Sequence, residues 1–335
     1  MTTNGRGLGG DAPTGGSEGS GVVAVAGEAL IDLVPAGREG LFEAAPGGSP
    51  ANVAVGLARL GVPVRLLARI AADPLGRRIR AHLTGNGVDL SWAVKAGEPT
   101  SLAIVTVGPD GSPEYDFRVE GTADWQWRDA ELVGSLDEGV VALHGGSLAF
   151  TMPPGADVLA RLFERARDTA TVSYDPNCRP LLMGAPEVVR DRIQALVARA
   201  DVVKVSAEDL AWMLPGRAPE QVAEAWLAKG PAIVAVTLGP GGVIATAREA
   251  ATVRRPGRRV AIVDTVGAGD SFMSALLAGL YRRGLLGAER RAQLGAIDPD
   301  TLAAVLDEAV LASAITCTRH GADPPTAQHL QAGIP

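Results

Sequence analysis

The sequence predicts an α/β fold in which a mostly parallel, doubly wound sheet carries helices on both faces. Three observations support this fold class. Strand and helix patterns alternate from residue 22 to residue 322. Several strand patterns end in polar or glycine-rich loops, which is where open parallel sheets bind ligands. No repeat, linker or second-domain boundary interrupts the alternation, so residues 21–335 are expected to form one domain.

Composition narrows the function classes. The chain has 335 residues, of which 47% are apolar and only 4% aromatic, so aliphatic side chains must fill the core. The net charge of −7 argues against nucleic-acid binding, which needs a basic face. Cys178 and Cys317 suggest no disulfide framework, and the four histidines lack metal-ligand spacing. A cytoplasmic protein is therefore expected.

The first 20 residues form a segment rich in Gly, Ser and Thr that cannot bury enough apolar surface to offset its ordering entropy. We expect a disordered tail. It has no apolar region typical of a secretory signal. Since no later run of about 18 apolar residues exists, no membrane partner is expected.

The remaining elements follow from their periodicity. Residues 45–61 place two glycines before a helix in which Val53, Leu57 and Leu60 share one face. A second helix runs from residue 73 through His82. Alternating patterns on both sides of the turn at 109–111 predict a hairpin. The predicted strands are 22–26, 64–70, 102–107, 115–119, 140–143, 171–174, 202–205 and 233–236, and an Ala-rich helix covers 302–318.

The most informative stretch covers residues 260–280, V-A-I-V-D-T-V-G-A-G-D-S-F-M-S-A-L-L-A-G-L. It predicts a buried strand at 260–263, a glycine loop and a helix at 271–280. The loop would aim the amides of Gly267, Ala268 and Gly269 at one point, together with the positive end of the helix dipole. Asp270 beside this anion site could accept a proton from a hydroxyl, as phosphoryl transfer requires. The alternative is that Asp270 merely caps the helix.

Two motifs carry a resemblance to a known family. The pattern D-T-x-G-A-G-D-x-F is complete from Asp264 to Phe272, and G-G-x-x-x-N-x-A is present from Gly47 to Ala54. Both motifs, in this order, resemble the signatures of the ribokinase-like (PfkB) carbohydrate kinases. The sequence P-G-G-S-P-A-N-V-A is typical of bacterial fructokinases, and the motif D-P-N-x-R-P at 175–180 occurs in fructokinases and in 2-keto-3-deoxygluconate kinases.

The resemblance implies a ribokinase-like fold and an ATP-dependent sugar kinase, with fructose as the expected substrate and 2-keto-3-deoxygluconate as the alternative. Asp270 would be the base, and Gly267, Ala268 and Gly269 the anion hole. Asp32 is expected to grip the sugar, although it could instead form a turn before Pro35. The residues expected to bind the sugar are Asp32, Gly47, Gly48, Asn52, Arg118 and Arg179. On residue type, Arg179 could equally pair with Asp175.

By the same resemblance, ATP would contact Lys204, Ser206, Thr237, Gly239, Gly242 and Gly269. Many relatives carry N-x-x-E where this chain has Ser206 and Asp209, so the pattern leaves Glu208 and Asp209 both open as residues that organise water around Mg²⁺. Asp264 and the Val266 carbonyl would adjoin a site for a monovalent cation such as K⁺. The region 302–322 would line the adenine pocket.

Strands roughly within 29–46 and 101–120 are expected to form a small sheet that lies over the site as a lid. In several family members this lid pairs with another subunit, so a homodimer is expected. One or two residues of the hairpin and of Gly121 to Trp125 should meet the sugar. Lid packing is the alternative role for Phe117 and Trp125, and the favoured one for Trp127.

Overall fold

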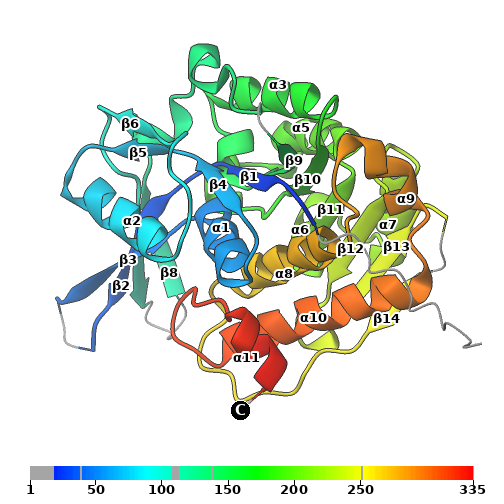
Figure 1. The fold of residues 1–335 in the computed structure, drawn as a ribbon. Coiled ribbons are helices and arrows are strands. Elements are labelled where there is room, and N and C mark those ends of the chain that lie inside the picture. Colours follow the sequence, from blue (N-terminus) through cyan, green and yellow to red (C-terminus); the bar gives the residue numbers. More distant parts are fainter. Residues whose placement is uncertain (1–18, 38–39, 108–112, 137–138, 250–251, 335) are drawn as a thin grey trace, which may run out of the picture.

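The computed structural model describes residues 19–37, 40–107, 113–136, 139–249 and 252–334. Residues 1–18 of the tail predicted at 1–20, and the predicted turn at 109–111, lie outside the described residues. The fold is α/β, as predicted, with a large central sheet and a smaller sheet on one side (Figure 1).

The central sheet has eight strands. Six neighbouring strands run parallel, and the two at the β14 edge run antiparallel to their neighbours. This mostly parallel order confirms the predicted fold class. The strands in spatial order are β14 (Val253–Arg255), β13 (Val243–Ala247), β12 (Ile233–Thr237), β11 (Val202–Ser206), β10 (Thr171–Asp175), β9 (Val140–Gly146), β1 (Val22–Ala26) and β4 (Val64–Leu67).

Helices cover both faces of this sheet (Figure 1). Several begin where the sequence supplies a cap: Asp73 accepts from the Gly76 amide, and Asp298 accepts from the Thr301 amide. The α-helices are α1 (Ser49–Arg59), α2 (Pro74–Gly85), α3 (Ala156–Ala166), α4 (Pro180–Met183), α5 (Pro186–Arg199), α6 (Ala207–Met213), α7 (Pro219–Leu227), α8 (Ala268–Arg282), α9 (Arg291–Gly295), α10 (Pro299–Cys317) and α11 (Ala327–Ala332). Short 3-10 helices lie at Ala123–Trp125, Asp129–Leu132, Leu148–Phe150, Gly239–Gly241 and Ala288–Arg290.

Two apolar cores lie on opposite faces of the sheet because successive strand residues point to opposite sides. In β1, Val23 and Val25 join the core that contains α1, α8 and α10, whereas Ala24 and Ala26 join the core that contains α3 and α5. This alternation decides which side chains of each strand face α8.

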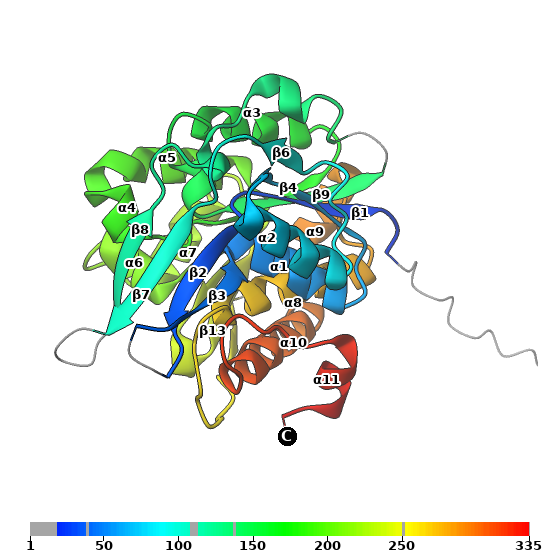
Figure 2. The same ribbon diagram turned by 90° about the vertical axis from the view of Figure 1, so that its left-hand side faces the viewer.

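The smaller sheet has the order β3-β2-β7-β8 and stands at one side of the molecule (Figure 2). It confirms the predicted smaller sheet, and its antiparallel pair β7 and β8 confirms the predicted hairpin. Its strands are β2 (Leu30–Pro35), β3 (Phe42–Gly47), β7 (Leu102–Val107) and β8 (Pro113–Arg118), and a separate pair is formed by β5 (Arg69–Ala71) and β6 (Val94–Ala96). We call the four-stranded sheet the lid.

The predicted buried strand at residues 260–263 is wrong. This segment has no strand structure, and the side chains of Ile262 and Val263 are 62% and 48% exposed. The sheet edge is formed by β14, and the Val263 amide instead donates to the Cys317 carbonyl at the end of α10, at 2.8 Å. β-Branched residues favour strands only where a partner strand is available.

Candidate active site

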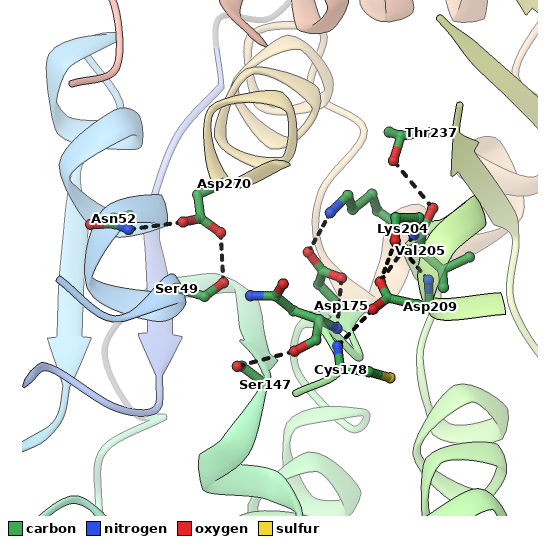
Figure 3. A network of polar contacts seen from close by, with 12 residues as sticks. Ser49, Asn52, Ser147, Asp175, Cys178, Lys204, Val205, Asp209, Thr237 and Asp270 are labelled. Atoms are coloured by element: carbon green, nitrogen blue, oxygen red, sulfur yellow. Dashed lines mark hydrogen bonds and ion pairs between the residues drawn. The ribbon is translucent and has the colours of Figure 1, made fainter. Parts of the chain in front are cut away.

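Asp270 lies in the first turn of α8, and its carboxylate accepts two hydrogen bonds from α1 (Figure 3). Ser49 Oγ donates to Oδ1 at 2.7 Å, and Asn52 Nδ2 donates to Oδ2 at 2.8 Å. The N-cap of α8 is Gly267, so the interpretation of Asp270 as the cap is wrong. Gly267 has φ 76°, and a β-carbon there would lie 2.6 Å from Ala322 Cβ, so only glycine fits this turn.

The start of α1 brings these donors to Asp270. Gly48 adopts φ 101° as the N-cap, and Pro50 occupies the first turn, where its missing N–H costs nothing. Ser49 was not among the predicted site residues. Its position between Gly48 and Pro50 at the opening of a helix was the available signal, but a serine there is equally common as a simple helix start.

A second polar cluster follows β10 and β11. Lys204 Nζ bonds Asp175 Oδ2 at 2.8 Å, and both side chains are buried (Figure 3). Burial by itself would lower the pKa of Lys204, but neighbouring carboxylates, with Asp175 the strongest, raise it above the ordinary value. Burial raises the pKa of Asp175 to about 6 against the opposing effect of Lys204. Both groups are therefore charged at neutral pH.

Ser206 and Asp209 form a reciprocal cap at the start of α6. The Asp209 amide donates to Ser206 Oγ at 2.9 Å, and Ser206 Oγ donates to Asp209 Oδ2 at 2.7 Å. Asp209 Oδ1 accepts from the Cys178 amide at 2.8 Å. Both oxygens of the Asp209 carboxylate are therefore engaged, whereas Glu208 beside it is exposed.

Asp32 lies within β2 and not in a turn before Pro35, so that alternative is wrong. Burial raises the pKa of its carboxyl to about 6, while Arg179 lowers the pKa and Asp270 raises it. These influences indicate that Asp32 lies close enough to Arg179 and Asp270 to interact with them electrostatically. Gly47 adjoins it, and a β-carbon on Gly47 would overlap Asp32 Oδ2, whereas Gly48 lies against the Glu28 carbonyl.

The two predicted arginines differ in position. Arg179 Nη1 donates to Asn177 Oδ1 at 2.8 Å and to the Cys178 carbonyl at 3.0 Å. Its predicted alternative, a pair with Asp175, is wrong, because Asp175 pairs with Lys204. Arg118 lies on β8 with its side chain 66% exposed and pairs with Asp116 at 2.6 Å.

The aromatic residues of the hairpin region are mostly structural. Trp125 and Trp127 are 2% and 3% exposed and belong to the core on the α3 and α5 side of the sheet. Phe117 is partly buried and packs against the same core. All three residues therefore pack in or against this core, although the buried indole N–H groups of Trp125 and Trp127 have no hydrogen-bond partner within the described residues.

The second glycine loop joins β12 to β13. Thr237 ends β12, and its hydroxyl donates to the Val205 carbonyl at 3.5 Å. Gly239 and Gly242 have φ 54° and 92°. A β-carbon on Gly242 would overlap the Arg255 carbonyl, so this glycine has a packing reason as well as the expected nucleotide role.

The predicted cation residues are held by backbone groups. Asp264 Oδ1 accepts from the Val266 amide at 3.0 Å, and Oδ2 accepts from the Gly321 amide at 2.9 Å. Within the residues that the structure describes, no cluster of three His, Cys, Asp or Glu side chains could hold a metal ion. In the same part of the chain, no helix is both long and apolar enough to cross a bilayer.

Comparison with known proteins places this geometry in context. A fructokinase of Klebsiella pneumoniae is 34% identical over 313 residues, which cover 90% of this chain and 95% of that protein. A crystal structure of fructokinase with bound ATP from Xylella fastidiosa matches with a TM-score of 0.84 and 28% identity, over 93% of this chain and 97% of that one.

A Vibrio cholerae fructokinase double mutant, in a form with bound fructose, ADP and potassium ion, matches with a TM-score of 0.81 and 27% identity, over 95% of this chain and all of that one. The family model described as "pfkB family carbohydrate kinase" matches residues 22–329. With both signatures in place and the match running almost end to end, this chain belongs to the pfkB family of carbohydrate kinases.

Proposed function

We propose that this protein is an ATP-dependent fructokinase that transfers the γ-phosphoryl group of ATP to the primary hydroxyl of fructose, giving fructose 6-phosphate and ADP. The observation that carries the proposal is the carboxylate of Asp270 at the amide N-terminus of α8, oriented by Ser49 and Asn52. An acid beside an anion site is the arrangement that phosphoryl transfer to an alcohol needs. The similarity to fructokinases supports fructose as the substrate.

In this mechanism Asp270 accepts the proton of the sugar hydroxyl. A bond forms between the sugar oxygen and the γ-phosphorus, and the bond from that phosphorus to the β–γ bridging oxygen breaks. The amides of Gly267 and Gly269 stabilise charge on the migrating group, aided by the dipole of α8. The Ala268 amide donates to the Thr265 carbonyl at 3.2 Å and would have to leave that bond to join them. A carboxylate has about four lone-pair positions, so the two bonds from α1 leave Asp270 able to accept this proton.

The sugar would lie between the lid and α1. Asp32 supplies a buried acceptor for hydroxyl groups, Gly47 and Gly48 allow close approach, and Arg179 supplies the nearby positive charge. A 2-keto-3-deoxygluconate kinase would need a pair of arginines for the substrate carboxylate. The exposed position of Arg118 and its pairing with Asp116 disfavour this alternative.

ATP would bind along the carboxyl ends of β11 and β12, at Lys204, Ser206, Thr237, Gly239, Gly242 and Gly269. Mg²⁺ would arrive with the nucleotide and supply charge neutralisation on its phosphates.

The exposed Glu208 fits a contact to the waters of Mg²⁺ better than Asp209, whose oxygens are engaged. For K⁺, the engagement of the Asp264 carboxylate favours main-chain carbonyls such as that of Val266 as the ligands.

We further propose that the protein forms a homodimer through the lid and works in the cytoplasm, where ATP is available. The exposed side chains of Leu41 and Phe42, at 51% and 42%, lie at and beside the start of the lid strand β3 and support a lid interface. Light scattering of the wild type and of Phe42→Glu would test it, since a charge at the interface should yield monomers.

A sugar panel with coupled detection of ADP tests the proposed function. Fructose should give the highest kcat/KM among fructose, glucose, ribose, 2-keto-3-deoxygluconate and aminoimidazole riboside. A higher kcat/KM for 2-keto-3-deoxygluconate would replace fructose by that acid. ATP binding without turnover of any sugar would point to a sensor that kept the fold.

A further inference from the structure

The register of two parallel strands places an acid and a lysine side by side beneath α8. Tyr174 of β10 pairs with Val203 of β11, so the next residues, Asp175 and Lys204, are also neighbours. Tyr174 and Val203 belong to the core on the α3 and α5 side of the sheet. Because strand residues alternate, Asp175 and Lys204 point to the opposite face, toward α8.

This pair is deeply buried. The side chains of Asp175 and Lys204 are 1% and 4% exposed, and Nζ lies 2.8 Å from Oδ2. A buried ion pair gains little stability over an apolar pair of the same size, because the desolvation cost offsets the attraction. The contribution of this pair to stability therefore does not explain why charged residues occupy these positions, whereas a role in function would explain it.

The lysine ammonium lies against the first turn of α8. A β-carbon on Gly269 would be 2.9 Å from Lys204 Nζ, so the ammonium adjoins the proposed anion hole. A cation next to the positive end of a helix is unfavourable without an anion nearby. In the structure the Asp175 carboxylate is that anion, and a phosphoryl group between Lys204 and the amides would be a second one.

Both oxygens of Asp175 are fixed. Oδ2 bonds Lys204, and Oδ1 accepts from the Asn177 amide at 3.1 Å, in a turn where Asn177 has φ 37°. An ammonium carries three donors, and in the described part of the chain Asp175 accepts the one hydrogen bond recorded for Nζ. The carboxylate thus holds the ammonium in one position while leaving it donors for an anionic ligand.

We propose that Asp175 is a positioning residue that holds the Lys204 ammonium at the amide N-terminus of α8, so that this cation meets the migrating phosphoryl group. The proposal rests on the proposed kinase function and deepens it. Asp175 itself touches neither sugar nor nucleotide in this arrangement and acts through Lys204.

A double-mutant cycle of Asp175→Asn, Lys204→Met and the combined variant tests this role. Losing a fixed charge at an anion hole typically lowers kcat by about 10²-fold, so we expect Lys204→Met to lose about that factor. Asp175→Asn should lose roughly 10- to 100-fold in kcat, with the KM for fructose changed by less than about threefold. The combined variant should be no slower than Lys204→Met, since Asp175 has no role once the lysine is absent.

Additive losses in the cycle, or a change in the KM for fructose without a change in kcat, would overturn the proposal. Such results would mean that Asp175 only shapes the turn at Asn177. As a matched control, Asp129→Asn removes the acid of an exposed ion pair with Arg161, and kcat should stay unchanged.

Two further measurements keep the test decisive. Lys204→Met leaves Asp175 buried without its partner and could unfold, but the combined variant removes both charges and should melt at a higher temperature than Lys204→Met. The same cycle is measured on the affinity for a non-hydrolysable ATP analogue, by calorimetry. If the two substitutions have non-additive effects on nucleotide affinity but the protein phosphorylates no sugar, the positioning role is supported and the kinase function is rejected. If the protein phosphorylates fructose but the two substitutions have additive effects on kcat, the kinase function is supported and the positioning role is rejected.

Discussion

Gly47 of β3 lies directly against the carboxylate of Asp32 in β2, so closely that a β-carbon on the glycine would overlap Oδ2. The position of the Asp32 carboxylate therefore depends on Gly47, at the end of the site where we propose that the sugar binds. The glycine is there because the acid occupies the space that a side chain would need.

The Gly47→Ala variant should fold normally but bind fructose weakly. The Asp32 carboxylate ends a short side chain and can rotate away from the new methyl group. The substitution should therefore change the orientation of the carboxylate without destabilising the fold. We expect the KM for fructose to rise about tenfold or more, which corresponds to the loss of one or two hydrogen bonds to a charged group. Steady-state kinetics at fixed ATP would measure this change.

Gly97→Ala is the matched control, because a β-carbon at Gly97 meets nothing within 4 Å. Its KM for fructose should equal that of the wild type. If Gly47→Ala also leaves the KM unchanged, Asp32 does not contact the sugar.

Acid should weaken sugar binding through Asp32. Burial raises the pKa of this carboxyl to about 6, so the group loses its charge as the pH falls through that value. Hydroxyl groups donate more strongly to the ionised form. We expect the dissociation constant for fructose, measured by calorimetry without ATP, to be constant above pH 7 and to rise by up to about tenfold per unit below pH 6.

Asp32→Asn separates this effect from the titration of other groups. The variant should bind fructose weakly at every pH, with a flat profile between pH 5 and 8. A pH profile parallel to that of the wild type would assign the titration to another residue.

Asp270→Asn should lose nearly all turnover and preserve the fold. An amide cannot take the proton of the sugar hydroxyl, so kcat should fall by about 10²- to 10⁴-fold, the usual contribution of a general base. The amide offers one acceptor oxygen where the carboxylate offers two, so one of the hydrogen bonds donated by Ser49 and Asn52 must be lost or reversed, and a small loss of melting temperature is expected.

The exposed Asp300 in the first turn of α10 provides the control for Asp270→Asn. Asp300→Asn should keep kcat. Wild-type turnover by Asp270→Asn would remove Asp270 from the role of base.

The fold was predictable because its strands are short apolar runs and its helices have clear periodicity. The prediction of a strand at 260–263 was wrong because β-branched residues do not reveal whether another strand, here β14, already forms the edge of the sheet. The two signatures indicated which loops matter. They could not show that Asp175 faces Lys204 rather than Arg179, because that choice depends on the register of β10 against β11. The roles expected from the resemblance for individual residues stay predictions until measured.

The junction between β1 and the lid contains a buried acid, Glu28, that should make stability depend on pH. Its Oε2 accepts from the Ala149 amide at 3.1 Å, and its side chain is 1% exposed. Burial raises its pKa to about 7, with hydrogen bonds from Ser147 and Ala149 opposing and Asp124 adding to the rise. The folded state therefore binds more protons than the unfolded state between about pH 4.5 and 7. The free energy of unfolding therefore falls as the pH rises through this window, and the full loss of stability is reached above pH 7.

Glu28→Gln should remove this penalty. The amide oxygen can accept from Ala149 as the acid does, while nothing has to be ionised. The gain in unfolding free energy over the wild type should grow from near zero at pH 4.5 to at most about 3 kcal/mol at pH 8, the equivalent of the pKa shift. Urea unfolding at four pH values would measure it, with Glu224→Gln on the exposed face of α7 as the surface control. A constant difference between Glu28→Gln and the wild type from pH 4.5 to 8 would show that Glu28 is ionised in the fold throughout, held by the amides that face it.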